Sequence, residues 1–191
     1  MSEYINGVDR DALVETSKAV EANTEVADFQ FRLKNSWVDG GENRSVINDF
    51  RGACQEHRRD RPFTMVNDEP PVLLGEDVGP NPVEYVLHAL AGCLTTSLVY
   101  HAAANRIAVR AVSTRFEGDL DLRGFLGMSD EVKRGYKAIR VVFDIDADVD
   151  EDGKRQLIAM GQKYSPVFEM VSAGVPVRCV MAGDADIRAA A

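Results

Sequence analysis

The stretch from Gly75 to Tyr100, GEDVGPNPVEYVLHALAGCLTTSLVY, constrains the fold of this 191-residue chain more than any other. It opens with turn-forming residues and then places Asn81 and Pro82 where the N-cap and the first residue of a helix belong. Apolar residues follow at helical spacing, and only Glu84 and His88 are strongly polar in the first four turns. Such a helix is expected to be buried on most of its sides rather than to lie on a surface.

A thiol lies well inside this predicted helix. Cys93 follows Pro82 by eleven residues and is flanked by Gly92 and by the hydroxyl-bearing run 95–97. Free cysteine is among the most buried residue types, so the residues alone favour a packing role. The positive end of a helix dipole acts over about one turn, and Cys93 is about three turns in. A reactive thiolate at this position therefore needs a cation from another part of the sequence.

The remaining pattern predicts an α+β fold, with antiparallel sheets around a long central helix. Amphipathic helices are expected over 9–22, where Asp9 is the cap, and over 150–163, and a short helix from Ser165 to about Ala173. A turn at 39–41 and a rigid Pro- and Gly-rich loop at 68–80 separate the elements of the first half. Alternating apolar and polar residues predict strands at 27–38, 45–57, 61–67, 108–123, 136–147 and 175–181.

Three regions are expected along the chain. Residues 1–25 form an N-terminal extension with one short helix, residues 26–182 form the main domain, and residues 183–191 form a polar, alanine-rich tail that is expected to fray. The first predicted sheet has only three short strands, so neither half of the domain closes a core alone. Pairing between two copies of the chain is therefore expected.

Charge and composition exclude several classes of partner. The chain has 31 acidic and 22 basic residues, for a net charge of −9, which argues against nucleic acid and anionic membranes as partners. No apolar run is expected to reach the roughly 18 residues that cross a bilayer, and the N-terminus lacks a signal-peptide pattern. We expect a cytoplasmic protein.

The cysteines and histidines do not form a metal-binding or disulfide pattern. The chain has three of each, without C-x-x-C spacing and without clustered carboxylates, so neither a metal nor another cofactor is expected. Cys54 is expected in a strand, and Cys179 is expected to face a core because it alternates with apolar neighbours. The residues concerned are Cys54, Cys93, Cys179, His57, His88 and His101.

Three segments together resemble a known family. They are GPNPVEYVLHALAGC, RGYKAIRVVFDIDADV and KYSPVFEMVSAGVPVRC, and with them the chain resembles the OsmC/Ohr family of thiol-dependent hydroperoxide reductases over about residues 29–181. The most specific match is the set Asn81, Pro82, Glu84 and Cys93. The resemblance implies an intertwined homodimer whose central helix carries the peroxidatic cysteine, here Cys93. A second cysteine and an arginine are implied near the subunit interface.

The implied arginine follows a double glycine in the first hairpin of the family. Here Gly40 and Gly41 are followed by Glu42, Asn43 and Arg44, so Arg44 is the candidate, displaced by two residues, although a hairpin arginine is as often simply solvated. The glutamate that orients this arginine would fall just before Gly75, where residues 72–74 are apolar. The nearest acidic residues, Glu69 and Glu84, are candidates to line the site. Further arginines that could serve are Arg51, Arg58, Arg59 and Arg61.

The resolving cysteine of the family is replaced by Ser165, which precedes Pro166. Serine forms no disulfide, so an oxidised Cys93 would need an external thiol or Cys179 for reduction. Ser165 is equally suited to be a helix N-cap or a hydroxyl that lines the site. Two functions therefore remain open. One is a one-cysteine reductase of organic hydroperoxides, and the other is a non-catalytic dimer that binds an apolar small molecule in its interface pocket.

Overall fold

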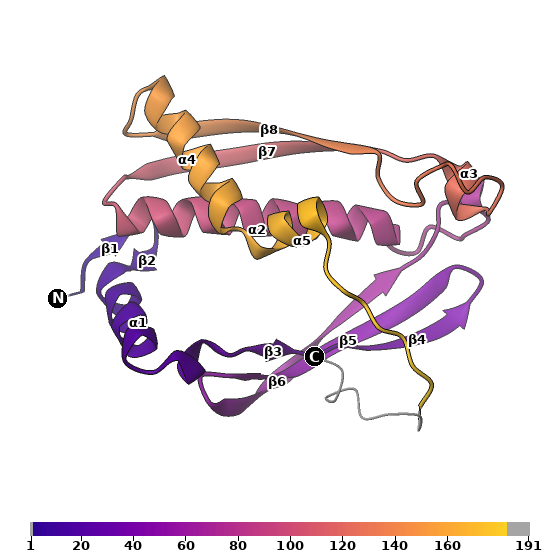
Figure 1. Ribbon diagram of the computed structural model, residues 1–191, viewed down its shortest axis with the longest axis horizontal. Helices are drawn as coiled ribbons and strands as arrows, with labels where there is room; N and C mark the ends of the chain where they lie inside the picture. Colours follow the sequence, from indigo (N-terminus) through magenta and orange to yellow (C-terminus); the bar gives the residue numbers. More distant parts are fainter. Residues whose placement is uncertain (1, 183–191) are drawn as a thin grey trace.

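The computed structural model describes residues 2–182, so the predicted tail at 183–191 lies outside the described residues. Figure 1 shows the long helix α2 between two groups of strands, with β7, β8 and α4 on one side and β3 to β6 on the other. In chain order the elements are β1 (Tyr4–Ile5), β2 (Val8–Asp9), α1 (Arg10–Ala22), η1 (Thr24–Ala27), β3 (Gln30–Phe31), β4 (Lys34–Asp39), β5 (Glu42–Gly52), β6 (Gln55–Asn67), η2 (Pro71–Leu73), α2 (Pro82–Ala104), β7 (Val109–Asp119), α3 (Leu122–Phe125), β8 (Ala138–Ala147), α4 (Glu151–Tyr164) and α5 (Pro166–Ala173).

The predicted start of α2 is confirmed. The Asn81 side chain accepts a hydrogen bond from the Val83 N–H at 2.9 Å, and the Glu84 carboxylate accepts one from the Asn81 N–H at 2.8 Å. This reciprocal arrangement is a capping box, which satisfies N–H groups that a helix start leaves unpaired. The first turn of α2 is therefore fixed by residues that lie next to one another in the sequence.

The core forms along one face of α2. Leu90, Leu94 and Leu98 are buried there, and Leu157 of α4 is fully buried in the cluster that contains Leu98. Gly161 lets α4 approach closely, since a Cβ at this position would lie 3.1 Å from the Leu94 carbonyl oxygen. The second sheet, an antiparallel pair of β7 and β8, covers the same cluster.

The opposite face of α2 is open, which corrects the expectation that this helix is buried on most sides. Ala89, Gly92 and Thr96, on the side of α2 away from its buried leucines, are exposed in the chain described. With 23 residues, α2 is also long and apolar enough to cross a membrane by length and composition, although no run of that kind was expected. A helix at the core of a folded domain can have the same composition, and its leucines here pack against α4.

The first sheet is built around β5, which pairs with β3, β4 and β6. The turn predicted at 39–41 is confirmed, but several predicted strands have wrong boundaries. The strand expected over 61–67 begins at Gln55, and the one expected over 108–123 ends at Asp119, before the unpredicted helix α3. The strand expected over 27–38 is interrupted between Phe31 and Lys34, and a turn at Ala53 and Cys54 divides the strand expected over 45–57. Both turn residues have positive φ angles, 48° and 61°. Cys54 is therefore exposed in a turn and not part of a strand.

A small hairpin of β1 and β2, which was not predicted, attaches the N-terminus to the end of α2. The Asn6 side chain donates to the Ile107 carbonyl at 3.0 Å and accepts from the Val109 N–H at 2.8 Å. The Arg10 side chain donates to the Ala104 carbonyl at 3.4 Å, at the last turn of α2. Asp9 caps α1 as predicted, by accepting from the Ala12 N–H.

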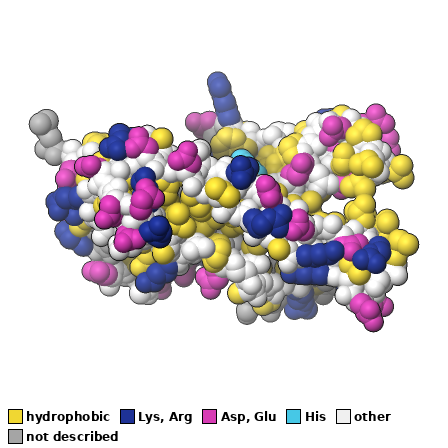
Figure 2. Space-filling view, turned by 90° about the horizontal axis from the view of Figure 1, so that it is seen from above, with side chains coloured by type: hydrophobic (Ala, Val, Ile, Leu, Met, Phe, Trp, Pro, Cys, Tyr) yellow, Lys and Arg dark blue, Asp and Glu magenta, His cyan; other side chains and the backbone are white. Residues whose placement is uncertain are grey.

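The segment after α5 has no strand, which corrects the strand predicted over 175–181. A strand is stable only when a neighbouring strand completes its hydrogen bonds, and residues 2–182 provide none to this segment. Cys179 is consequently exposed and does not face a core. Hydrophobic side chains are also exposed elsewhere, and Figure 2 shows them gathered at the end of the molecule that carries α3.

The core makes a direct stability prediction. Leu98→Ala should lower the free energy of unfolding by about 2–5 kcal/mol, because a fully buried leucine leaves a cavity when it is truncated. Urea denaturation followed by circular dichroism measures the change. Thr96→Ala, at an exposed position of the same helix, is the control and should change stability by less than about 1 kcal/mol. Equal effects of the two substitutions would contradict this placement of the core.

Candidate functional site

Cys93 lies at the edge of the open face of α2. The thiol is free and the residue is partly exposed. Ala89 and Thr96, about one turn before and after it, are exposed as well. A Cβ built on the neighbouring Gly92 would meet no atom within 4 Å. The thiol therefore lies beside small side chains on a partly exposed part of α2.

Ser165 is placed close to this part of α2. Ser97, one turn after Cys93, donates a hydrogen bond to the carbonyl of Tyr164 at 3.3 Å. Ser165 is 2% exposed, and its hydroxyl accepts from the Phe168 N–H at 3.1 Å. The predicted N-cap role of Ser165 is thus confirmed. The junction of α4 and α5 is held against the turn of α2 that follows the thiol.

Arg44 interacts within its own strand. It lies on β5 directly after the β4–β5 turn, and its guanidinium bonds the Glu42 carboxylate at 2.8 Å. The side chain is 57% exposed. Among residues 2–182, no arginine forms a hydrogen bond with Cys93, so a single copy of the chain does not bring the predicted cation to the thiol.

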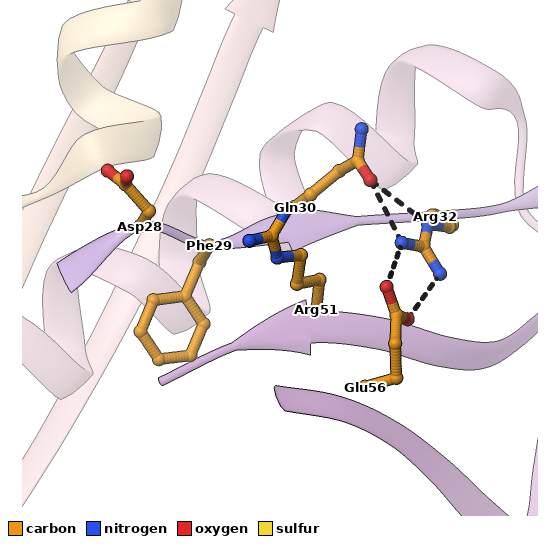
Figure 3. Close-up of a pocket in the computed structure, with 6 residues that line it drawn as sticks. All are labelled: Asp28, Phe29, Gln30, Arg32, Arg51 and Glu56. Carbon is orange, nitrogen blue, oxygen red and sulfur yellow. Dashed lines mark hydrogen bonds and ion pairs between the residues drawn. The ribbon is translucent and has the colours of Figure 1, made fainter. Parts of the chain in front are cut away.

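Two of the other candidate arginines, Arg51 and Arg59, lie among side chains of the first sheet. Arg51 lines a shallow pocket of about 260 Å³ together with Arg32 and Glu56, as Figure 3 shows. The Arg59 guanidinium lies over the Phe50 ring, 5.2 Å from its centroid, and donates to a backbone carbonyl of β5. These contacts are again within the first sheet and not with α2.

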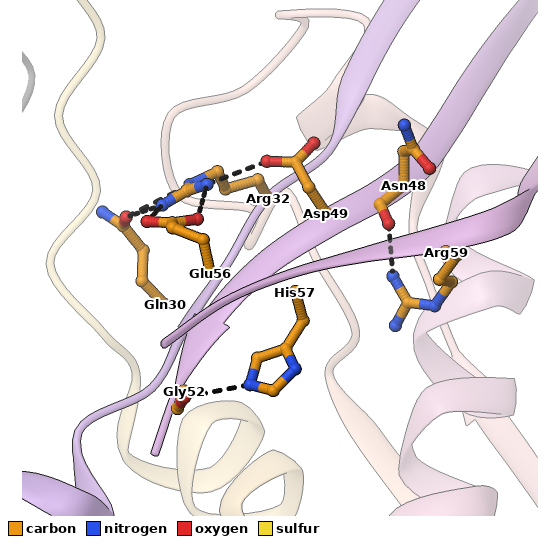
Figure 4. A network of polar contacts seen from close by, with 8 residues as sticks. All are labelled: Gln30, Arg32, Asn48, Asp49, Gly52, Glu56, His57 and Arg59. Atoms are coloured by element: carbon orange, nitrogen blue, oxygen red, sulfur yellow. Dashed lines mark hydrogen bonds and ion pairs between the residues drawn. The ribbon is translucent and has the colours of Figure 1, made fainter. Parts of the chain in front are cut away.

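One face of this sheet carries a charged network. The Arg32 guanidinium bonds the carboxylates of Asp49 and Glu56, each at 2.8 Å, and the side-chain oxygen of Gln30. The hydrogen bonds from Arg32 lower the pKa values of both carboxyl groups, because they favour the charged form. Figure 4 shows these four side chains on one side of the strands, with His57 on the other. The network stabilises the pairing of β3, β5 and β6.

The other face of the sheet is aromatic. Phe31 and Phe50 stack with centroids 5.6 Å apart, and Phe50 stacks on His57 at 4.6 Å. Although it belongs to this cluster, Phe31 is 72% exposed. We call this surface the aromatic face. Its members are Phe29, which directly precedes β3, Phe31 of β3, Phe50 of β5, and His57 and Phe63 of β6.

Glu69 and Glu84, the acidic candidates, both hold the start of α2. The Glu69 carboxylate accepts a short hydrogen bond from the Asn81 side-chain amide, and Glu84 completes the capping box. The main-chain oxygen of Glu69 accepts from the Asp77 N–H at 3.2 Å. The described hydrogen bonds of these two residues therefore position the helix that carries Cys93.

Asp68 is a structural residue that the sequence analysis missed. It is 1% exposed, and its carboxylate accepts hydrogen bonds from the N–H groups of Glu69, Glu76 and Val78 at 2.8 to 3.3 Å. Burial opposes ionisation of this group, but the backbone donors outweigh it and lower its pKa. An aspartate between a strand and a Pro- and Gly-rich loop is the available sequence signal, because aspartate side chains accept from nearby backbone.

Within residues 2–182, no group of three or more His, Cys, Asp or Glu side chains is arranged to hold a metal ion. The arrangement around Cys93 instead offers a reduced, accessible sulfur on a helix whose two ends are held by hydrogen bonds. Such a thiol can attack an electrophile that enters from the open face of α2, provided that a cation supports the thiolate.

Comparison with known proteins gives a consistent result. A family model described as OsmC-like protein matches residues 75–180, more than half of the chain. An OsmC-like protein from Mycoplasma pneumoniae has 15% sequence identity and a TM-score of 0.59, covering 74% of this chain and 86% of its own. An organic hydroperoxide resistance protein, OsmC, from Legionella pneumophila has 16% identity and a TM-score of 0.52, covering 76% and 90%. A comparison with curated proteins found no match.

The role of Asp68 can be tested by its pH dependence. Because the folded state lowers the pKa of this carboxyl below its usual 3.8, its stabilising effect is present above that pH and is lost as the pH falls through the folded pKa. Asp68→Asn should therefore lower the melting temperature at pH 7. It should also narrow the difference between the melting temperatures at pH 7 and pH 3. Asp77→Asn, in the same loop but exposed, is the matched control. Equal melting curves for both variants would contradict this role.

Proposed function

Because this chain belongs to the OsmC-like family, we propose that it is a thiol-dependent reductase of organic hydroperoxides in which Cys93 is the nucleophile. The observation that carries the proposal is the position of a free, partly exposed Cys93 on the central helix, one turn from the exposed residues Ala89 and Thr96. The similarity to an organic hydroperoxide resistance protein from Legionella pneumophila supports the same class of substrate.

In the first step, the Cys93 thiolate attacks the terminal oxygen of the hydroperoxide. The O–O bond breaks, an S–O bond forms, and the departing alkoxide takes up a proton to give the alcohol. The sulfur is oxidised to a sulfenic acid and the peroxide is reduced. A cation beside the thiolate would favour this step, because it stabilises the negative charge on the nucleophile and on the developing alkoxide.

In the second step, an external thiol reduces the sulfenic acid. Its sulfur attacks the Cys93 sulfur and water leaves, which gives a mixed disulfide, and a second external thiol then releases reduced Cys93. Ser165 stands at the junction next to this part of α2, and its hydroxyl is engaged with the Phe168 N–H. A hydroxyl forms no disulfide, so we propose an enzyme of the one-cysteine type that is reduced by an external thiol and not by Cys179.

We further propose that two copies of the chain form an intertwined homodimer. Three surfaces support this: the aromatic face of the first sheet, the open face of α2, and the extended segment after α5, which has no partner strand among the described residues. Each presents groups that folding normally covers or pairs. In such a dimer, an arginine from the first sheet of one copy, Arg44 or one of its neighbours, would support Cys93 of the other.

The thiol chemistry predicts a selective loss of activity. Cys93→Ser should reduce consumption of cumene hydroperoxide, with dithiothreitol as reductant, by at least about a hundredfold, because a hydroxyl is a far weaker nucleophile. Trapping with dimedone followed by mass spectrometry should find sulfenic acid on Cys93 alone. Cys54→Ser and Cys179→Ser are the matched controls and should retain activity. Unchanged turnover in Cys93→Ser would refute the proposal, and loss in Cys179→Ser would identify an internal resolving thiol instead.

The proposed homodimer makes a prediction about the strength of self-association. Phe31→Asp should raise the dissociation constant of the dimer by at least about a hundredfold, because each of two symmetric copies loses roughly 1.5–3 kcal/mol of aromatic burial. Light scattering after size-exclusion chromatography over a concentration series measures this. Gln30→Asp, the adjacent residue on the charged face, is the control for the added charge. A wild-type protein that is monomeric at every concentration would contradict the homodimer.

A further inference from the structure

A groove of about 500 Å³ lies where α2, β8 and α5 meet. Its volume falls in the range of sites that hold small molecules, which is about 300–1,000 Å³. The apolar lining comes from the first half of α2, the first half of β8 and one side of α5. These residues are Val83, Val86, Leu90, Ala138, Ile139, Val141, Phe168 and Val171.

Most polar groups of the groove belong to the segment that precedes β8, and Ser172 of α5 adds a hydroxyl. Lys133 and Lys137 both contribute to the lining, which contains no aspartate or glutamate. Lys137 is paired with Asp121 at 2.9 Å, whereas Lys133 forms no ion pair with any residue from 2 to 182. The Tyr136 hydroxyl is already used, since it donates to the Val83 carbonyl at 2.9 Å. One ammonium group of the lining is therefore available to a ligand.

This lining has the opposite charge to the chain as a whole. The chain has a net charge of −9, yet the charged side chains that line the groove are both lysines. An apolar groove with one unpaired ammonium group in its lining complements a molecule with an apolar chain and a terminal anionic group. The shape and charge thus match a single-chain carboxylate better than a neutral or cationic molecule.

The groove is separate from the proposed catalytic thiol. It follows α2 as far as Leu90, and Cys93, almost one turn further along, does not contribute to the lining. Ser165 also lies outside the lining, although α5, which it caps, supplies Phe168 and Val171. A ligand in the groove therefore requires no reaction at Cys93.

We propose that this groove is a binding site for a single-chain amphipathic carboxylate, with the apolar chain between α2, β8 and α5 and the carboxylate at Lys133. The ligand is bound and released unchanged. Its carboxylate is recognised by one ammonium group at a solvent-exposed position, so charge contributes modestly to affinity and apolar burial contributes most of it.

Isothermal titration calorimetry of the full-length protein with sodium dodecanoate, kept below its micelle concentration, tests the site. We expect saturable binding with one ligand per chain, weakened about threefold to fivefold in Lys133→Gln and at least about tenfold in Val171→Trp, which fills the groove. Lys18→Gln, on the exposed helix α1, is the matched control and should bind like the wild type. Cys93→Ser should also retain binding, whether or not the protein is a peroxidase.

Several results would overturn the inference. Absence of saturable binding up to about 1 mM would exclude the site. Equal affinity for dodecanoate, dodecanol and dodecyltrimethylammonium would exclude recognition of the carboxylate. Unchanged binding in Val171→Trp would place the ligand elsewhere. Binding by monomeric Phe31→Asp but not by the wild type would mean that a second copy covers the groove, which also excludes the site in the assembled protein.

Discussion

The close packing of α4 on α2 is the contact on which the rest of this structure depends. Gly161 allows the backbone of α4 to approach the Leu94 carbonyl, and Leu157 joins the buried cluster around Leu98. Because side chains on one helical face share one environment, burying this face turns the face next to Cys93 outward. The same contact places Tyr164 and Ser165 beside the turn that follows the thiol. Core packing and access to the sulfur are thus two consequences of one helix orientation.

Hydrogen bonds at both ends of α2 then fix the position of this helix in the fold. At its start, Asp68 organises the preceding loop and Glu69 holds the capping residue Asn81. At its end, Asn6 and Arg10 bond backbone groups in and just beyond the last turn. The contacts at its end join segments about 100 residues apart in the sequence. Cys93 therefore lies in the middle of a helix that is held by hydrogen bonds at both ends.

The two faces of the first sheet explain why a second copy matters to the proposed chemistry. The charged network around Arg32 is satisfied within one sheet face, so it needs no further partner. The aromatic face around Phe31 and Phe50 remains exposed, and apolar area of this kind is favourable to bury. The candidate arginines lie on this same sheet, whereas Cys93 lies on α2. Covering the aromatic face with a second copy would bring such residues and the thiol into one assembly.

The sequence by itself determined the elements whose signals are local. The caps Asp9, Asn81 and Ser165, the turn after Asp39 and the extents of the main helices were readable, because each depends on neighbouring residues. Only the tertiary structure decided that Cys54 lies in a turn, that residues 175–181 form no strand, that Asp68 is buried, and which face of α2 stays open. Strand pairing, burial and access depend on partners distant in the sequence, and alternation of residue types does not specify which partner is present.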